Sequence, residues 1–254
     1  MHFRPCIDLH NGKVKQIVGS SLGADGFAVE NFVSQESPAY YAELYWKDGL
    51  TGGHLILLGP GNDEAAHEAL SVHPGHLQVG GGVTPDNAQQ WLDAGAGKLI
   101  VTSWLFPNGE LDFERLARFT REFSRERLVL DLSCRPVDGE YHVTCNRWQT
   151  TCAFTITPQT LRQLTDSCSE FLIHAVQVEG KKSGIDRRLV ELLAEGCGGM
   201  IPVTYAGGIR SFEDIQELEN VGGGHVDFTV GSALDIFGGS MSYADLVKRS
   251  GRRP

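Results

Sequence analysis

Short apolar runs alternate with amphipathic segments along the whole chain, and a turn separates each run from the segment that follows. Because the runs are continuously apolar, they indicate strands covered on both faces. Eight such strand and helix pairs predict a parallel sheet covered by helices, and closure of that sheet gives an α/β fold of the (β/α)8 barrel type. The expected strands lie at 3–9, 54–58, 77–79, 99–101, 128–130, 171–176, 201–204 and 227–230, and the expected helices at 38–46, 63–70, 85–94, 111–123, 158–164, 186–194, 212–218 and 243–248.

Two segments interrupt this order. Asn11-Gly12 between alternating apolar residues is a strong signal for a β-hairpin, and residues 19–33, rich in Gly and Ser, are expected to form a flexible loop. A second hairpin is predicted around Asp138-Gly139, in an insertion after the fifth strand. Because the loops after barrel strands build the active face, we expect this hairpin to form a flap over the site.

The two halves of the chain repeat each other. Each half begins with a strand that ends in an aspartate, and each contains an apolar run, a glycine pair and a helix near its end. This internal similarity predicts a barrel built from two half-barrel repeats. The matching features are Asp8 and Asp131, Gly81-Gly82 and Gly207-Gly208, and Thr102-Ser103 and Gly231-Ser232.

The glycine pairs are candidate phosphate sites. A single Gly-Gly between a strand and a helix is more often a plain tight turn. The repeat favours a ligand, because adjacent glycines let the backbone approach closely and the following helix offers free amide groups to an anion. The expected phosphate-binding residues are Gly81, Gly82, Thr102, Ser103, Gly207, Gly208, Gly231 and Ser232.

Asp8 and Asp131 are candidate catalytic residues. They end the first and fifth strands, which face each other across a closed barrel, while the glycine pairs follow the third and seventh strands. This arrangement predicts an elongated ligand with a phosphate at each end. Two facing carboxyl groups at its middle suit general acid and general base catalysis.

Length, charge and cysteine content narrow the class of protein. The chain has 254 residues, 41% of them hydrophobic, and contains no Pro/Gly/Ser-rich linker, so we expect one domain over 1–254. A net charge of −10 argues against nucleic acid as a partner. The six cysteines show no C-x-x-C pair and no zinc spacing, so no metal site is expected.

The sequence also carries expectations about location and assembly. No apolar stretch is long enough to cross a membrane, and the first strand starts too early for a targeting segment, so we expect a cytoplasmic protein without membrane contact. A monomer is the default expectation.

Four segments resemble one known family, the ribonucleotide isomerases of histidine biosynthesis (ProFAR isomerases). The resemblance covers nearly the whole chain, and the combination of segments is specific although each piece is not. The segments are Pro5-Cys6-Ile7-Asp8-Leu9-His10-Asn11-Gly12-Lys13-Val14, Gln78-Val79-Gly80-Gly81-Gly82, Ala206-Gly207-Gly208-Ile209 and Val230-Gly231-Ser232-Ala233-Leu234.

The resemblance implies an Amadori rearrangement of an aminoaldose to an aminoketose, on a small bisphosphorylated ribonucleotide and without metal or cofactor. It implies Asp8 as the general base. Two residues match acidic positions of the family and stay open as the general acid: Asp131 after the fifth strand and Glu179 in the loop after the sixth.

The sequence departs from the common bacterial pattern in two places. The loop after the sixth strand contains His174 and Ala175 where Thr and Asp are usual, and Glu179 replaces a later Asp. The second strand ends in Gly59-Pro60-Gly61-Asn62 in place of an acidic pattern. Both departures resemble the eukaryotic-type branch of the family. His174 is a further catalytic candidate, although a buried histidine is more often a hydrogen-bonded core residue.

Five other residues are candidates for substrate contacts. Trp148 could stack on a planar heterocycle, or pack on its own hairpin. Arg147, Arg210 and Lys13 carry charges suited to phosphate or carboxamide groups, although a surface cation is the commoner role. Gly180 completes the set, next to Glu179.

Two alternative functions remain at this stage. The sister cyclase of the same pathway resembles this chain in its half-barrel repeat, its twin phosphate sites and its paired aspartates. Dependence on ammonia would distinguish it from the isomerase. A non-catalytic barrel that binds a phosphorylated ligand would use the glycine turns, but two opposed carboxylates near an anion are costly and superfluous for binding.

Overall fold

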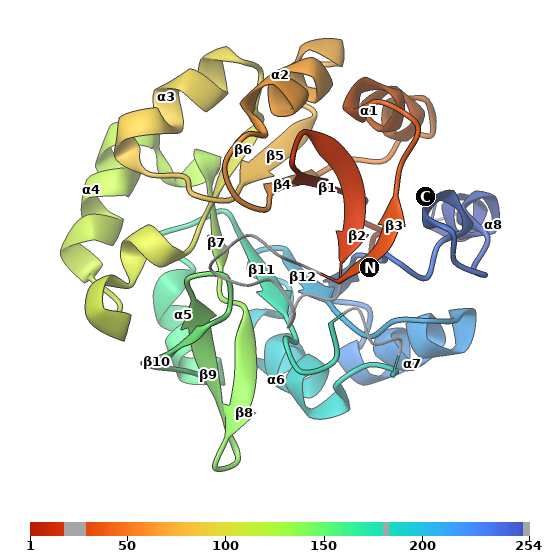
Figure 1. Cartoon of the computed structure of the whole chain (residues 1–254). Coiled ribbons are helices and arrows are strands. Elements are labelled where there is room, and N and C mark those ends of the chain that lie inside the picture. Colours follow the sequence, from red (N-terminus) through yellow and green to blue (C-terminus); the bar gives the residue numbers. More distant parts are fainter. Residues whose placement is uncertain (18–28, 180–182, 251–254) are drawn as a thin grey trace.

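The computed structural model describes residues 1–17, 29–179 and 183–250. Within these residues eight strands run parallel and alternate with helices, as the sequence predicts (Figure 1). The parallel strands are β1 (Cys6–His10), β4 (Gly53–Leu57), β5 (Leu77–Gly80), β6 (Lys98–Val101), β7 (Leu128–Asp131), β11 (Glu170–His174), β12 (Val203–Ala206) and β13 (Asp227–Phe228). The helices are α1 (Pro38–Lys47), α2 (Asp63–Val72), α3 (Pro85–Asp93), α4 (Phe113–Phe123), α5 (Pro158–Leu164), α6 (Arg187–Cys197), α7 (Phe212–Gly222) and α8 (Tyr243–Ser250).

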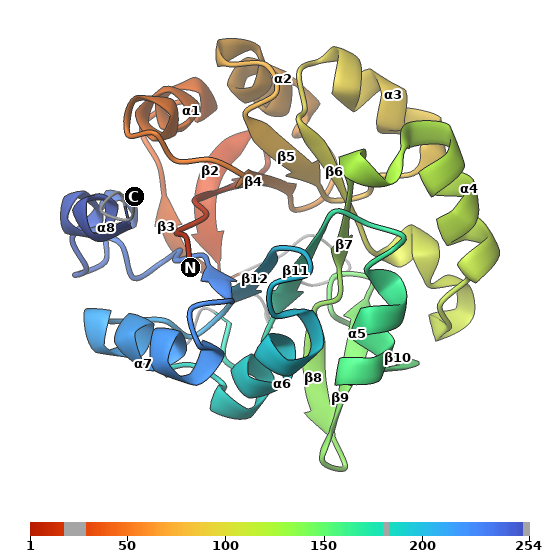
Figure 2. The ribbon, with the colours of Figure 1, turned by 180° about the vertical axis from the view of Figure 1, so that it is seen from behind.

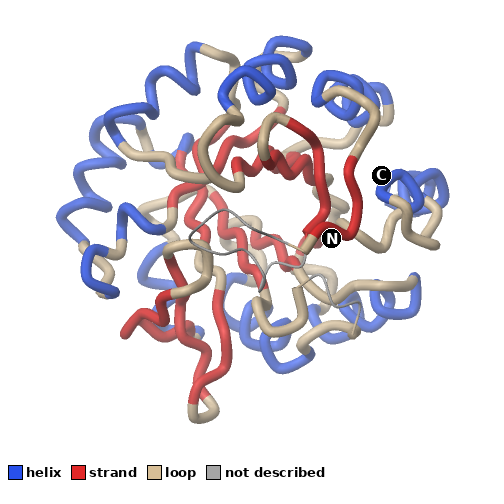
Figure 3. The backbone as a smooth tube through the Cα atoms, viewed as in Figure 1, coloured by secondary structure: helices blue, strands red, loops and turns tan. Residues whose placement is uncertain are grey.

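The sheet curls until its first and last strands meet. Its parallel strands follow the order β13-β12-β11-β7-β6-β5-β4-β1. The Arg4 amide donates to the Phe228 carbonyl (2.8 Å), and the Phe228 amide donates to the His2 carbonyl (3.0 Å). The Arg4 guanidinium also pairs with Asp227 across this seam (2.8 Å). Strands therefore form an inner ring and helices an outer one, the (β/α)8 arrangement (Figures 2 and 3).

Side-chain alternation along the strands sorts the barrel interior into layers. In β11, Glu170, Leu172 and His174 share one face because side chains two apart in a strand point the same way. Leu172 belongs to a buried apolar layer, Glu170 lies below it and His174 ends the strand above it. The remaining members of the layer are Ile100, Val129 and Ala206, with Ile56 packed against them. Polar groups at the carboxyl ends of the strands thus rest on an apolar floor.

Both predicted hairpins are present. β2 (Lys13–Ile17) pairs antiparallel with β1 around Asn11-Gly12, where both residues have positive φ. After β7, the strands β8 (Cys134–Val137), β9 (Glu140–Cys145) and β10 (Thr150–Ile156) form a separate antiparallel sheet that projects from the barrel (Figure 1). Asp138 and Gly139 make the first turn of this sheet, with φ values of 49° and 85°.

The expectation of a loop over residues 19–33 is wrong at its end. Positions 30–33 form strand β3 (Glu30–Val33), which pairs antiparallel with β2, while 18–28 lie outside the described residues. Lys15 forms an ion pair with Glu30 across the two strands (2.5 Å), and Phe32 packs on Phe237. The partner strand and the ion pair stabilise an extended segment whose own sequence shows no strand pattern.

Capping residues mark the N-termini of two helices. Ser37 caps α1, its side chain accepting a hydrogen bond from the Tyr40 amide, and Pro38 occupies the first helical position, as expected. Thr84 and Asn87 form a capping box at the start of α3. No helix in the described ranges combines the length and the apolar character that crossing a membrane requires.

Substitution of two adjacent glycines should have unequal effects. A Cβ atom at Gly81 would lie 2.1 Å from the Leu57 carbonyl oxygen, whereas one at Gly82 would meet nothing within 4 Å, and both residues have positive φ. We expect Gly82→Ala to lower the free energy of unfolding by about 1 kcal/mol and Gly81→Ala by more than about 3 kcal/mol, measured by urea denaturation. Equal losses in the two variants would contradict this account.

Candidate active site

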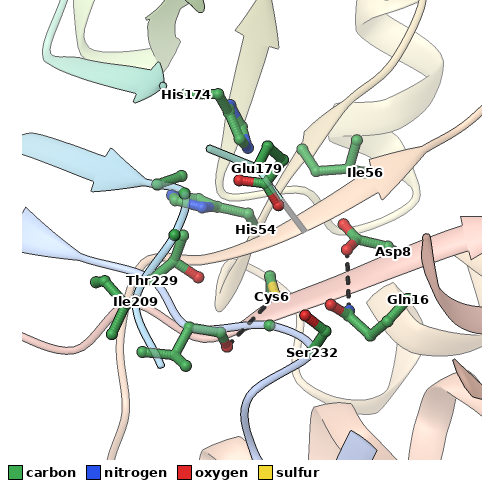
Figure 4. A pocket seen from close by; sticks show the side chains of 15 residues that line it. Cys6, Asp8, Gln16, His54, Ile56, His174, Glu179, Ile209, Thr229 and Ser232 are labelled. Carbon is green, nitrogen blue, oxygen red and sulfur yellow. Dashed lines mark hydrogen bonds between the residues drawn. The ribbon is translucent and has the colours of Figure 1, made fainter. Parts of the chain in front are cut away.

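Two adjoining cavities open at the carboxyl ends of the barrel strands. The larger, about 680 Å³, lies on the side of β5 and β6 and reaches the flap. The smaller, about 40 Å³, lies beside the turns that follow β12 and β13 (Figure 4). Four side chains line both cavities, namely Asp8, Ile56, His174 and Glu179. Three ionisable groups therefore stand at the junction of the two spaces.

Asp8, on β1, is half-buried at this junction. The Gln16 amide from β2 donates a hydrogen bond to its carboxylate (3.0 Å). Burial and the nearby Glu179 carboxylate raise the pKa of Asp8 to about 7, against the opposing effects of His174 and Gln16. A pKa close to neutral pH suits a general base, because the carboxylate form is then populated and is also a stronger proton acceptor than an ordinary carboxylate.

Asp131 and His174 form a pair on the neighbouring strands β7 and β11. Their closest atoms are 4.0 Å apart, and the Ser133 hydroxyl bridges them, lying 2.5 Å from Asp131 Oδ1 and 3.0 Å from His174 Nδ1. Ser133 has one proton to donate, so donation to Asp131 makes His174 Nδ1–H the donor to Ser133. Ser133 was not among the residues predicted from the sequence.

The pair shifts the two pKa values in opposite directions. Burial would raise the pKa of Asp131, but His174 and the hydrogen bonds from Ser133 outweigh it, and the pKa falls below 3.8. Burial would lower the pKa of His174, but Asp131, with Glu179 and Asp8, raises it above 6.5. Asp131 is therefore held as a carboxylate and His174 is favoured as an imidazolium.

Glu179 reaches the centre from the turn after β11. Burial raises the pKa of its carboxyl group above 4.5, and one oxygen, Oε2, has no hydrogen-bond partner among the described residues. A Cβ atom at Gly207 would lie 3.1 Å from that oxygen. The glycine turn after β12 thus leaves room for this carboxyl group.

The structure adds two polar residues that sequence reasoning missed, His54 on β4 and Thr229 after β13. Both are buried against the smaller cavity, and His54 Nε2 and Thr229 Oγ1 find no hydrogen-bond partner in the part of the chain that is described (Figure 4). Burial lowers the pKa of His54 to about 3, so its imidazole is neutral. The sequence signal that could have identified them is a polar residue within an otherwise apolar run.

The two glycine turns lie on opposite sides of the centre. Gly81 and Gly82, with Thr102 and Ser103, line the larger cavity. Gly207, Gly208, Gly231 and Ser232 line the smaller one. Gly231 has an additional steric role, because a Cβ atom there would lie 2.2 Å from Gln16 Oε1 and displace the amide that bonds Asp8.

The flap contributes Arg147 and Trp148 to the larger cavity. The centroids of the Trp148 and His174 rings are 5.5 Å apart. The backbone carbonyl of Trp148 accepts a hydrogen bond from the Arg135 guanidinium. The flap loop is further tied to the turn after β6, because the backbone amide of Asn146 donates to the Ser103 hydroxyl (2.9 Å). Two residues predicted on the flap, Arg147 and Trp148, therefore form part of the wall of the larger cavity.

Two other candidates lie apart from the cavities, and a third cannot be placed. Lys13 is exposed on β2 and lines neither space. Arg210 is half-exposed and pairs with Asp214 (3.4 Å) at the start of α7, outside both linings. Gly180 lies outside the described residues. In residues 1–17, 29–179 and 183–250, no group of three or more His, Cys, Asp and Glu side chains is arranged to hold a metal ion.

The raised pKa of the Asp8 carboxyl should make stability depend on pH. Its pKa is about 7 in the folded state against 3.8 when exposed, so the folded state binds more protons between these values and the free energy of unfolding falls as pH rises through them. We expect Asp8→Asn to match the wild type near pH 4 and to be more stable by roughly 4 kcal/mol at pH 8. Urea denaturation at both pH values measures this, with the exposed Asp93→Asn as the control. A gain that is the same at both pH values would refute the burial argument.

Comparison with known proteins agrees with this geometry. Residues 3–241 match the family described as Histidine biosynthesis protein. A protein of Neurospora crassa is 51% identical over 241 residues, covering 93% of each chain, and one of Saccharomyces cerevisiae is 46% identical over 245 residues, covering 94% of each. A Medicago truncatula protein is 49% identical over 256 residues, covering 97% of this chain and 81% of the relative.

All three relatives carry the name 1-(5-phosphoribosyl)-5-((5-phosphoribosylamino)methylideneamino)imidazole-4-carboxamide isomerase, and the Medicago truncatula name adds that it is chloroplastic. Their plant and fungal sources agree with the eukaryotic-type features at His174 and Glu179. The family match over most of the chain, together with these identities, shows that this chain belongs to the histidine biosynthesis protein family.

Proposed function

We propose that this chain is an isomerase that converts the bisphosphorylated ribonucleotide named for its relatives into the phosphoribulosyl form, by an Amadori rearrangement. The observation that carries the proposal is the row of Asp8, His174 and Glu179 at the junction of two cavities, each of which ends in a glycine turn. A substrate with a phosphate at each end would span the two turns and present its reacting carbons to the ionisable groups.

The phosphates are proposed to bind at the two glycine turns. The N-terminus of α3 follows Gly81-Gly82, and that of α7 follows Gly207-Gly208, so each turn combines free amides with the positive end of a helix dipole. The hydroxyl groups of Ser103 and Ser232 line the same ends of the cavities. An overall acidic protein can bind a dianion in this way because local amides supply the donors.

The rearrangement moves a proton and needs no external electron source. A general acid assists opening of the ribose ring, which gives a protonated Schiff base at C1′. A general base then removes the proton from C2′, and the resulting enolamine takes up a proton at C1′ to give the ketose. Asp8 is proposed as the base, because its raised pKa makes the carboxylate a competent proton acceptor near pH 7.

His174 is proposed as the acid, held in its charged form by Asp131 through Ser133. The lowered pKa of Asp131 disfavours that carboxyl as a proton donor, which speaks against the sequence-based alternative. Glu179, whose pKa is raised by burial, is the second candidate for the acid. In this scheme Asp131 orients and charges the imidazole, as a carboxylate does beside a catalytic histidine.

Other aspects remain predictions. Trp148 is proposed to stack on the imidazole ring of the substrate, with Arg147 beside it on the flap. One domain over 1–254, a cytoplasmic location and a monomeric state are proposed from the sequence, and the chloroplastic name of one relative belongs to that protein.

Turnover of the ribonucleotide should depend on Asp8. We expect Asp8→Asn to lower kcat at least about a thousandfold while the dissociation constant of the substrate changes little, because the amide cannot accept the C2′ proton. Absorbance assays and isothermal titration measure these quantities, with Asp93→Asn as a matched control on an exposed carboxylate. Binding without turnover in the wild type, with and without ammonia, would reject the isomerase in favour of a binding protein; turnover only with ammonia would indicate the cyclase.

The pH profile should distinguish the candidate acids. In the wild type, kcat/KM should rise with pH around 7 as Asp8 ionises, and fall at higher pH as His174 loses its proton. Asp131→Asn removes the charge that raises the pKa of His174, so the alkaline limb should move to lower pH while measurable activity remains. Complete loss of activity at every pH in Asp131→Asn would instead identify Asp131 as the proton donor.

A further inference from the structure

Two cysteines face each other at the base of the flap loop. Cys145 ends β9 and Cys152 lies in β10, and their sulfur atoms are 3.3 Å apart. Both side chains are buried, and the adjacent ladder pairs Cys145 with Thr150 before the register shifts. Among the described residues this is the one pair of cysteines whose sulfur atoms are in contact.

The loop between the two cysteines carries residues of the larger cavity. Asn146, Arg147 and Trp148 all have positive φ (52°, 57° and 63°), a conformation that costs energy in residues other than glycine. The loop is held at its ends by the flap strands and by the bond from Asn146 to Ser103. A change at the cysteines therefore acts on the segment that positions Arg147 and Trp148.

We propose that Cys145 and Cys152 form a modification site, at which a small-molecule disulfide such as oxidised glutathione converts the two thiols into an intramolecular disulfide. One cysteine thiolate attacks the glutathione disulfide, which forms a mixed disulfide and releases one glutathione thiol. The second cysteine then attacks the protein sulfur of the mixed disulfide and releases the second glutathione thiol. Two thiols are oxidised, and one disulfide is reduced.

Burial sets the rate of this reaction. It raises the pKa of Cys152 to about 12, together with the neighbouring Cys145, so little thiolate exists at neutral pH. The flanking residues Asn146, Thr151 and Ala153 are exposed, and β10 is an edge strand, so a local opening of the loop admits a small oxidant. The reaction should therefore be slow at pH 7 and faster as pH rises.

The disulfide would change the cavity wall. The sulfur atoms would approach from 3.3 Å to about 2.05 Å, which draws together the two ends of the loop. Displacement of Arg147 and Trp148 should weaken substrate binding more than the chemical step, because the groups at the centre come from β1, β7, β11 and the turn after β11, not from the flap loop. This catalytic consequence rests on the proposed function, whereas formation of the disulfide does not.

Peptide mapping after oxidation tests the proposal. The purified full chain is incubated with oxidised glutathione at pH 8, free thiols are alkylated in denaturant, and the protein is digested with trypsin. Cleavage after Arg147 separates Cys145 from Cys152, so a disulfide holds together the peptides 128–147 and 148–162, and fragmentation distinguishes Cys145 from Cys134. We expect this linked pair, the loss of two of the six thiols, and reversal by dithiothreitol.

Variants and kinetics complete the experiment. Cys152→Ser and Cys145→Ser lack one partner of the pair, so neither should give the linked peptides, and the remaining cysteine of the pair should go no further than a mixed disulfide with glutathione. Cys197→Ser, which removes a buried cysteine elsewhere, should oxidise like the wild type. Glutathione that stays on one cysteine, a bond between other cysteines, or six unchanged thiols in the wild type would each overturn the proposal. In the oxidised wild type, KM should rise about threefold or more with a smaller change in kcat.

An unchanged KM in the oxidised protein would overturn the effect on the cavity but leave the modification site in place. Absence of turnover in the reduced protein would count against the proposed function alone, because the mapping does not depend on activity.

Discussion

The partial desolvation of Asp8 beside a second carboxyl group is the constraint on which the site depends. A carboxyl group in solution has a pKa near 4 and is a weak base at neutral pH. Here burial and the adjacent Glu179 raise the pKa to about 7, and the apolar layer that includes Val129 and Leu172 forms the floor that keeps water away from below. The barrel supplies this environment because side chains alternate along its strands, so that apolar residues fill the middle and polar ones the carboxyl end.

The same centre contains a second environment with the opposite effect. Asp131 is also partly desolvated, but Ser133 provides hydrogen bonds and His174 positive charge, so the pKa of Asp131 is lowered while that of His174 is raised. Two aspartates that are equivalent in the sequence repeat thus have different protonation behaviour. Acid and base chemistry in one cavity requires this separation of pKa values.

Much of the fold could be predicted from sequence because its signals are local. Apolar runs, the Asn11-Gly12 and Asp138-Gly139 turns and the cap at Ser37 depend on residues close in the chain, and the structure contains the corresponding elements. Strand β3 was missed because it is stabilised by pairing with β2 and by the ion pair of Lys15 with Glu30, and neither is visible in residues 30–33 alone.

The sequence by itself determined the barrel class, the half-barrel repeat and the presence of Asp8, Asp131, Glu179 and the glycine turns at strand ends. Only the tertiary structure decided which of these groups meet, and with what charge. The contacts of Ser133 with His174, of Gln16 with Asp8 and of Gly231 with Gln16 join different strands of the barrel. Protonation depends on burial and on charges brought together from distant parts of the chain, and no local pattern encodes those distances.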